Sequence, residues 1–251
     1  DMGSPWARLA VTSAAGNDPL ILANTLWNNN AHNNFEAKGE LLASLNQTAG
    51  QKGNIEKLCS ALEILTDNKF DFIFQQMALD GLLLGLKSNK IDPEKAKSHQ
   101  SLNNLVQQII SSERLAMRRS GWELARTLRL EPNKDQQKQL VESSKRVSDS
   151  SQPLEDRLAH LALLEFDTPE NRTPILFSLL DSKQPAELQK ASIDQLGDIQ
   201  GQNIAEKLVE RWDTLGPAVR TQAGNILLYK RGNHDILLTA LENGDLSLGE
   251  L

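Results

Sequence analysis

The helix expected from Glu113 to Leu130 carries the residues whose types and spacing could bind a ligand. Four arginines and one tryptophan follow one another at steps of four, four, four and three residues, which places them on one face of a helix. Guanidinium groups can grip phosphate or carboxylate, and they stack on aromatic rings. This arginine face is the candidate partner-binding site, and it consists of Arg114, Arg118, Trp122, Arg126 and Arg129.

Three interpretations of the arginine face stay open. The arginines can pair with acids of a neighbouring helix and form an ordinary solvated face, they can bind an acidic protein, or they can bind nucleic acid. The chain has 27 Lys and Arg against 33 Asp and Glu, a net charge of −6. That charge disfavours nucleic acid and anionic membranes as partners of the whole chain, although a local basic patch can outweigh it.

The sequence predicts no catalytic, metal-binding or cofactor-binding residue. The four histidines do not stand at metal-ligand spacing to one another, and no Cys-x-x-Cys-His motif for covalent haem is present. Cys59 can form no internal disulfide and is expected to be a small buried hydrophobe. One histidine is expected at the edge of a packed helix (His160) and two in asparagine-rich loops (His32 and His234), with His99 as the fourth.

Two further features have a plain structural interpretation. Gly81 and Gly85 lie in an apolar helix without the Lys-Ser or Lys-Thr of a phosphate loop, so we expect them to permit close helix packing.

The segment from Asn28 to Asn34 is either an interaction loop or, as its composition favours, a linker between helices. The longest apolar stretch, Met77 to Leu86, is too short to span a bilayer.

A period of 32 residues organises the last third of the chain. A fixed period in this range is typical of helical repeat arrays, in which each unit buries its apolar face against its neighbours. The equivalent positions are Pro153, Pro185 and Pro217, then Ala159, Ala191 and Ala223, then Leu164, Leu196 and Leu228, and finally Leu176, Leu208 and Ala240.

The apolar spacing predicts helices throughout, and no alternating run of β-branched residues predicts a strand. The fold class is therefore all-α. The repeat region should hold three helix pairs, 154–165 with 174–180, 185–196 with 204–212, and 217–229 with 235–241. Before it we expect helices at 5–14, 19–27, 35–45, 55–65, 70–86, 94–111, 113–130 and 135–147.

The predicted organisation is one continuous solenoid of antiparallel helix pairs over residues 1–251. Repeats are irregular up to about residue 150 and regular from residue 151 onward. Neither end carries the polar capping unit that such arrays need. We therefore expect this segment to be excised from a longer protein and to be monomeric by itself.

The repeat unit resembles the short form of the HEAT repeat. The resemblance lies in Pro217-Ala218-Val219-Arg220 followed by Ala223 and Leu227-Leu228, and it implies a HEAT-like, armadillo-like alpha-alpha superhelix. The segments 5–10, 158–162, 205–212 and 237–244 are further similar to the HEAT-like part of large planctomycete and verrucomicrobial proteins, membrane-bound dehydrogenase-like proteins in which this part lies between a propeller and a cytochrome c domain. The haem motif of that family is absent here, so haem binding is carried over to no residue.

These resemblances imply a non-catalytic scaffold that binds proteins or spaces adjacent domains of the same chain. The parent protein would then be a haem-containing, dehydrogenase-like oxidoreductase, and the segment would be periplasmic or extracytoplasmic. The alternative is a DNA-binding or DNA-glycosylase-type enzyme of the HEAT-like class that uses the arginine face from Arg114 to Arg129. A third possibility, a lyase or chaperone for tetrapyrrole attachment, rests on fold analogy alone.

Overall fold

The computed structural model describes residues 4–16, 18–28, 35–67, 69–88, 91–247 and 249. Every regular element in these residues is a helix, which confirms the all-α prediction. The described chain divides into two compact units, unit 1 up to Gln136 and unit 2 from Gln137 onward. Of the loop predicted from Asn28 to Asn34, Asn28 is the last residue of helix α2, and the rest, with His32, lies outside the described residues.

Unit 1 holds most of the helices that the sequence predicts for the irregular part, although several bounds differ and the helix expected over 113–130 spans only Leu115–Thr127. The first and fourth match the predicted ranges, whereas the third runs seven residues further than expected. The helices are α1 (Pro5–Ala14), α2 (Pro19–Asn28), α3 (Phe35–Lys52), α4 (Ile55–Leu65), α5 (Phe72–Lys87), α6 (Pro93–Ser98), α7 (Gln100–Ile110) and α8 (Leu115–Thr127).

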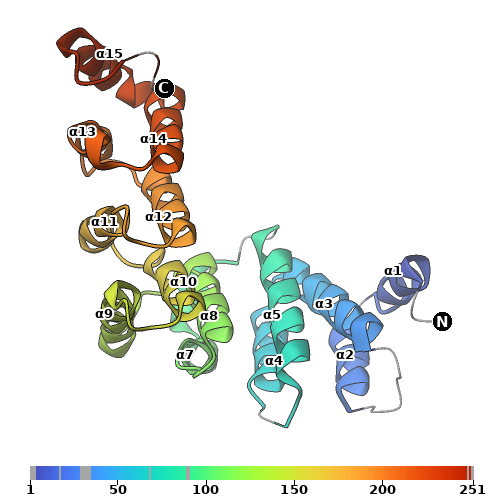
Figure 1. Ribbon diagram of the computed structural model, residues 1–251. Helices are drawn as coiled ribbons and strands as arrows, with labels where there is room; N and C mark the ends of the chain where they lie inside the picture. The colour runs from blue at the N-terminus through green and yellow to red at the C-terminus, as the bar shows by residue number, and fades with distance from the viewer. Residues whose placement is uncertain are drawn as a thin grey trace. The chain divides into compact units, whose positions relative to one another are not determined.

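Helices α3 and α5 pack with their backbones in contact, and Figure 1 shows them side by side. A Cβ atom added at Gly81 would lie 2.1 Å from the carbonyl oxygen of Ala43, and one added at Gly85 would lie 2.1 Å from that of Gln47. Any side chain at these two positions would push the helices apart. The prediction that Gly81 and Gly85 allow close packing is confirmed.

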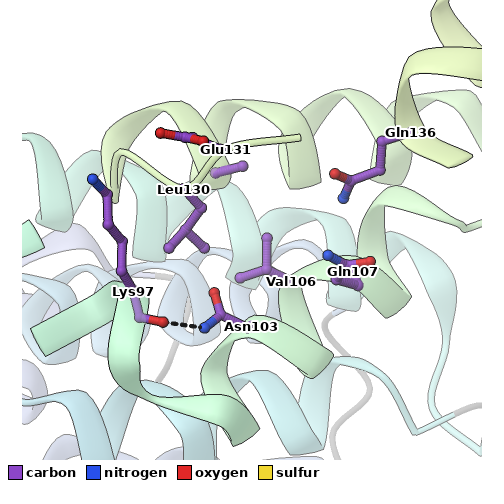
Figure 2. A pocket seen from close by; sticks show the side chains of 8 residues that line it. Lys97, Asn103, Val106, Gln107, Leu130, Glu131 and Gln136 are labelled. Atoms are coloured by element: carbon purple, nitrogen blue, oxygen red, sulfur yellow. Dashed lines mark hydrogen bonds between the residues drawn. The ribbon is translucent and has the colours of Figure 1, made fainter. Parts of the chain in front are cut away.

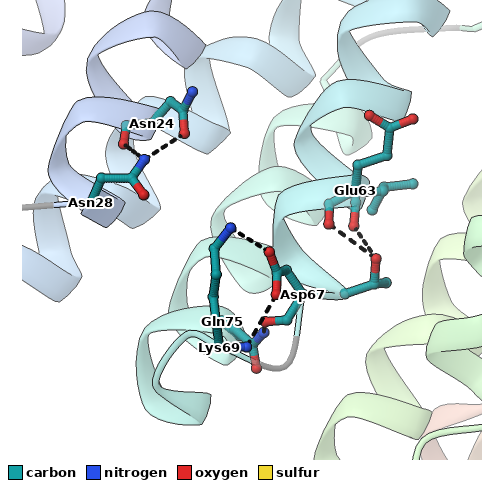
Figure 3. A network of polar contacts seen from close by, with 8 residues as sticks. Asn24, Asn28, Glu63, Asp67, Lys69 and Gln75 are labelled. Atoms are coloured by element: carbon teal, nitrogen blue, oxygen red, sulfur yellow. Dashed lines mark hydrogen bonds and ion pairs between the residues drawn. The ribbon is translucent and has the colours of Figure 1, made fainter.

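The connection from α4 to α5 is held by Asp67, shown in Figure 3. Its carboxylate accepts from the backbone N–H of Lys69 at 3.1 Å and pairs with the Lys69 ammonium at 2.6 Å. Its carbonyl oxygen accepts from the Gln75 side chain at 2.8 Å. These contacts, above all the one to the Lys69 side chain, lower the pKa of Asp67, because they favour the charged carboxylate.

The single helix predicted over 94–111 is wrong, because the chain breaks at His99. The His99 backbone is extended (φ −88°, ψ 96°) and separates α6 from α7. Its Nδ1 accepts the backbone N–H of Leu102 at 3.2 Å, so the imidazole caps α7. The Asn103 side chain donates to the carbonyl of Lys97 at 2.8 Å, which satisfies the end of α6.

Unit 2 is built from helix pairs in two rows. In Figure 1, α10, α12 and α14 follow one another in one row, and α11, α13 and α15 form the other. Each proline of the 32-residue period stands at the start of a helix in the first row. The helices are α9 (Lys134–Ser148, which begins in unit 1), α10 (Leu154–Leu164), α11 (Pro169–Ser178), α12 (Ala186–Asp198), α13 (Ile204–Glu210), α14 (Pro217–Tyr229) and α15 (His234–Asn243).

The prediction that a helix starts at Pro174 is wrong. Helix α11 begins five residues earlier, because Thr168 caps it and Pro169 occupies its first position. Pro169 lacks only an N–H that the first turn would leave unpaired. Pro174 therefore lies inside the helix.

Positions 32 residues apart occupy similar environments. Leu176 and Leu208 are fully buried and Ala240 is 3% exposed. Leu164 and Leu196 are also fully buried, but Leu228 is 39% exposed. The reason for this difference is that Leu228 lies on α14, which no later helix of its row follows among the described residues.

Side chains of the second helix pair, α12 and α13, and of the residues flanking α13 reach back to the first pair, α10 and α11, at a nearly constant sequence separation. Gln195 donates to the carbonyl of Leu161 at 2.8 Å, 34 residues away. Arg211 donates to the carbonyl of Phe177 at 3.5 Å, also 34 residues away. Gln202 donates to the Glu170 carboxylate at 2.8 Å, across 32 residues. The first and second helix pairs of unit 2 are therefore joined in both rows.

A long polar side chain near the start of each first-row helix holds the preceding connection. Arg157 on α10 is 3% exposed and donates to the carbonyl of Val147 at 2.9 Å. Gln189 on α12 donates to the carbonyl of Asp181 at 3.1 Å. Arg220 on α14 donates to the carbonyl of Trp212 at 3.0 Å. The carbonyls of Asp181 and Trp212 also accept a backbone N–H, from Gln184 and Leu215. These bonds therefore tie each first-row helix to the connection before it.

Candidate partner-binding surfaces

Helix α8 carries the arginine face, and its other side packs into unit 1. The residues expected in the core are buried, since Met117, Leu124, Ala125 and Leu128 are each at most 6% exposed. A Cβ added at Gly121 would lie 2.8 Å from the backbone nitrogen of Ile110. The helix is therefore held rigidly against α7, and its exposed side is fixed in orientation.

Trp122 does not lie on an exposed face with the arginines. Its side chain is only 4% exposed, so the prediction of an indole that a partner could reach between guanidinium groups is wrong. Residue 122 stands next to Gly121, Leu124 and Ala125, which are all buried. The buried side of α8 is thus wider than the apolar spacing indicates. The Trp122 side chain belongs to this buried side and not to the exposed row of arginines.

Two of the arginines already contact groups of unit 1. Arg118 donates from Nε and Nη2 to the carbonyl of Ser112, at 3.1 and 2.8 Å, and so ties the connection from α7 to its own helix. Arg126 pairs with Glu123 one turn earlier on α8, and Glu123 also pairs with Lys87 of α5 at 3.1 Å. These contacts favour the interpretation of a solvated, ion-paired face.

Arg114 and Arg129 are exposed at opposite ends of α8. The guanidinium of Arg114 stacks on the Phe72 ring with 4.1 Å to its centroid, beside a recess of about 420 Å³ that Gln75 and Met117 also line. Arg129 follows the C-terminal end of the helix with a left-handed backbone (φ 55°). The rise of 1.5 Å per residue separates the two by roughly 20 Å. The structure therefore does not bring the five predicted residues into one exposed cluster.

A second recess of unit 1, of about 370 Å³, lies beside α7 and is shown in Figure 2. Three of its amide side chains make hydrogen bonds within the protein. Asn103 donates to the carbonyl of Lys97, Gln107 accepts from the Asn133 side chain, and Gln136 accepts from the Asn133 backbone at 2.7 Å. Asn103 thus holds the end of α6, while Gln107 and Gln136 hold the connection from α8 to α9 through Asn133.

The cysteine and the described histidines are buried or lie close to polar groups of the protein itself. Cys59 is buried as predicted, and burial raises the pKa of its thiol. His160 is 6% exposed and lies 3.2 Å from the Ser143 hydroxyl. His234 is exposed and its Nε2 lies 2.8 Å from the carbonyl of Leu228. Within the described ranges, no group of three or more His, Cys, Asp or Glu side chains could hold a metal ion.

A groove of about 350 Å³ between α13 and α15 is the second candidate surface. Its floor is formed by Val209, Ile236 and Ala240. Carboxylates surround this floor, Glu206 and Glu210 from α13 and Asp235 and Asp245 from the α15 region. We call this site the acidic groove.

The acidic groove is not apparent from the amino-acid sequence, although two of its carboxylates show a recognisable spacing. Glu206 and Glu210 stand four residues apart on α13, a spacing that places two like charges on one helix face. That arrangement costs helix stability rather than adding to it. The contribution of α15 was not visible, because only the packing of α13 against α15 brings Asp235 beside α13.

The charges of the chain are divided unevenly between its two units. Unit 1 contains fifteen basic and fifteen acidic residues, whereas unit 2 contains twelve basic and eighteen acidic residues. The net charge of −6 therefore belongs to unit 2. The acidic groove lies in the unit with the negative field, and the arginine face lies in the neutral unit.

Comparisons of the chain with protein-family models, with curated proteins and with solved structures found no match. None of the described helices is long and apolar enough to cross a membrane. What the protein binds therefore has to be inferred from its own surfaces.

Proposed function

We propose that this chain is a non-catalytic scaffold that binds proteins, built as a HEAT-like solenoid of helix pairs. The observation that supports it is that equivalent positions 32 residues apart in unit 2 are buried alike, Leu164 with Leu196 and Leu176 with Leu208. Gln195, Arg211 and Gln202 also join the second helix pair to the first across 32 to 34 residues. A solenoid grows by contacts between neighbouring units alone, and these contacts span about one repeat length.

This architecture separates packing from recognition. On α13, Ala205 and Leu208 are buried and hold the row together, whereas Glu206 and Glu210 are exposed. Exposed positions of stacked helices can therefore present a long surface of chosen charge without disturbing the core. That property suits a protein that positions other proteins or domains.

Cross-linking in the cells that naturally produce the protein tests this function. The photoreactive residue p-benzoylphenylalanine would replace one exposed residue at a time, Ala116 on α8, Ser178 on α11, Thr221 on α14 or Thr239 on α15. A binding scaffold should give discrete protein adducts from some helix faces and none from Ser150, an exposed control in a turn. The absence of any protein adduct from all four positions would overturn the proposal.

The resemblance to the propeller–HEAT–cytochrome proteins leads to a narrower proposal, that the scaffold spaces domains of a haem-containing dehydrogenase. The intact mass of the native gene product and its reduced-minus-oxidised visible spectrum test it. A chain much longer than 251 residues with c-type bands would support the spacer role. A native chain without a chromophore would contradict it and leave the general binding function in place.

A further inference from the structure

We propose that the acidic groove binds a basic segment of a partner protein that carries aliphatic side chains between its lysines or arginines. This inference rests on the proposed binding function and names the chemistry of the partner. It is carried by the combination of an apolar floor with a carboxylate rim on both sides of the groove.

The floor of the groove needs an apolar side chain to cover it. Val209 and Ile236 are partly buried, and Ala240 between them and the core is 3% exposed. The volume of about 350 Å³ lies at the small end of the range for ligand pockets. It has room for side chains of a peptide but not for a folded domain. A purely polar segment would leave the floor in contact with water.

The rim of the groove needs positive charge. Glu206, Glu210, Asp235 and Asp245 are exposed, and among the described residues none of these carboxylates makes an ion pair. No described basic side chain lines the groove. The four charges repel one another, and a cationic partner would relieve this repulsion.

Other occupants fit these features less well. Nucleic acid, an acidic protein or an anionic membrane would be repelled by the rim. The four carboxylates do not form a group that could hold a metal ion within the described chain, and a metal would leave the apolar floor uncovered. A basic segment with aliphatic residues is the one class of partner that meets both surfaces.

The probe is a fluorescein-labelled peptide, Gly-Lys-Lys-Leu-Ile-Lys-Lys-Gly, whose binding to the whole chain is followed by fluorescence anisotropy. Two control peptides separate the contributions, one with serines in place of Leu-Ile and one with glutamates in place of the lysines. We expect binding of the first peptide that weakens about tenfold between 50 and 300 mM salt, since exposed ion pairs are screened. The two control peptides should bind at least tenfold more weakly.

Paired variants show whether the peptide binds in the groove. Glu206→Gln with Glu210→Gln removes two charges spaced by four residues on α13, and Asp194→Asn with Asp198→Asn removes the same charge at the same spacing on α12, outside the groove. We expect at least a tenfold loss of affinity for the first pair and at most twofold for the second. Equal losses would mean attraction to bulk charge and would overturn the proposal.

A second pair of variants adds charge at matched threonines. Thr239 lines the groove and Thr221 lies on α14 outside it, and each is exposed and donates its hydroxyl to the carbonyl four residues earlier. Thr239→Lys should abolish peptide binding, while Thr221→Lys should leave it within twofold of the unchanged protein. Circular dichroism checks that all variants keep their helix content, and unaffected binding to Thr239→Lys would overturn the site.

The cross-linking experiment separates this inference from the function on which it rests. If protein adducts form from Ala116, Ser178 or Thr221 while the peptide does not bind, the groove proposal fails and the scaffold function stands. If no position gives an adduct, the scaffold function itself fails.

Discussion

Units 1 and 2 are both all-helical, but the helices within each unit are held together by different kinds of contact. In unit 1, α3 and α5 touch through their backbones at Gly81 and Gly85. In unit 2, the Gly197 position has ordinary side-chain contact only, and neighbouring pairs are joined by side chains such as Gln195 and Arg157. The prolines of the 32-residue period all stand at helix starts of unit 2, where side-chain contacts join the helices. Unit 1, in which two helix backbones touch at glycines, holds the irregular helices.

The units also differ in charge in a way that bears on binding. Unit 1 is neutral and its arginines mostly contact groups of the unit itself, through Ser112, Glu123 and the Phe72 ring. Unit 2 carries the net negative charge, and the carboxylates of the acidic groove have no internal counter-ions among the described residues. A charge in an internal ion pair is already balanced by its partner within the protein. The surface whose charges lack such partners is therefore the better candidate for binding another protein.

The largest expected effect is that of Ala223→Arg in unit 2. Ala223 has no exposed surface, and a long charged side chain there would overpack the interface and bury an unpaired charge. We expect a loss of at least about 3 kcal/mol in the stability of unit 2. Ala191→Arg should cost less, because Ala191 is partly exposed.

Hydrogen exchange measured by mass spectrometry checks this prediction unit by unit. Amide protection should fall in α12, α14 and α15, while α3 and α5 keep theirs, since solenoid contacts are made between neighbours. Unchanged protection in Ala223→Arg would contradict the burial of position 223 between the helices of unit 2.

Gly81→Ala and Gly197→Ala test the difference in packing directly. In unit 1 the new Cβ would meet the backbone of Ala43 at 2.1 Å, and a backbone cannot move aside as a side chain can. We expect a loss of about 3 kcal/mol. In unit 2 the new Cβ would lie 3.6 Å from Ile226, and alanine should stabilise the helix by up to about 1 kcal/mol.

Urea unfolding of the two variants gives both numbers. Opposite signs would support the contrast between a backbone contact in unit 1 and a side-chain contact in unit 2. A neutral effect of Gly81→Ala would show that α3 and α5 can separate without cost and would remove that contrast.

Much of the fold could be predicted from the sequence, and the misses have local causes. The ranges of α1, α4 and α14 were predicted correctly, because capping residues and prolines mark their starts. The break at His99 was missed, because an imidazole that caps a helix leaves no spacing signal. The start of α11 was missed, because Pro174 was given more weight than Thr168-Pro169.

The candidate sites were harder to predict than the fold. The helical spacing of the arginine face holds for Arg118, Trp122 and Arg126, whereas Arg114 and Arg129 flank α8. Spacing also does not tell which residues face the core, and Trp122 proved to be buried. The acidic groove joins residues of α13 with residues about thirty positions later, and only the tertiary packing of two helices shows that they meet. Surfaces assembled between elements are thus less visible in a sequence than elements themselves.

A smaller effect is expected from Arg157→Met, which removes the side chain that holds the α9–α10 connection. The loss of its bonds to the Val147 carbonyl (2.9 Å) and the Gln184 side chain (2.8 Å) leaves a buried carbonyl unsatisfied. We expect a cost of about 2 kcal/mol. Gln189→Met, at the equivalent position of the next pair, should cost less because Gln189 is partly exposed and neutral.

Denaturant titration of the two variants ranks these costs. If Arg157→Met left stability unchanged, side-chain bonds to the preceding connection would not be what sets the spacing of the pairs, and apolar packing alone would have to explain it.

The smallest effects are expected from two aspartates whose pKa values move in opposite directions in the two units. Asp80 lies in the seam between α5 and α8, where its carboxylate accepts from Gln76 at 2.8 Å and Ser120 at 3.2 Å. Partial burial nevertheless raises the pKa of Asp80. Asp149 lies after α9 in unit 2, and hydrogen bonds, led by that from the Ser151 hydroxyl, lower the pKa of Asp149 to about 2.

The two shifts give pH dependences of opposite sign. A raised folded-state pKa means that Asp80 contributes stability below its unfolded pKa of about 3.9 and loses it as pH rises through the folded value. A lowered folded-state pKa means that Asp149 contributes stability above its unfolded pKa and loses that contribution as pH falls toward 2.

Asp80→Asn should therefore raise the free energy of unfolding at pH 7 relative to its effect at pH 3.5, and Asp149→Asn should lower the free energy of unfolding at pH 7. Urea unfolding between pH 2.5 and 7 measures both. Solvent reaches both carboxylates, which keeps the effects small, but two curves of the same sign would contradict the different surroundings assigned to these aspartates.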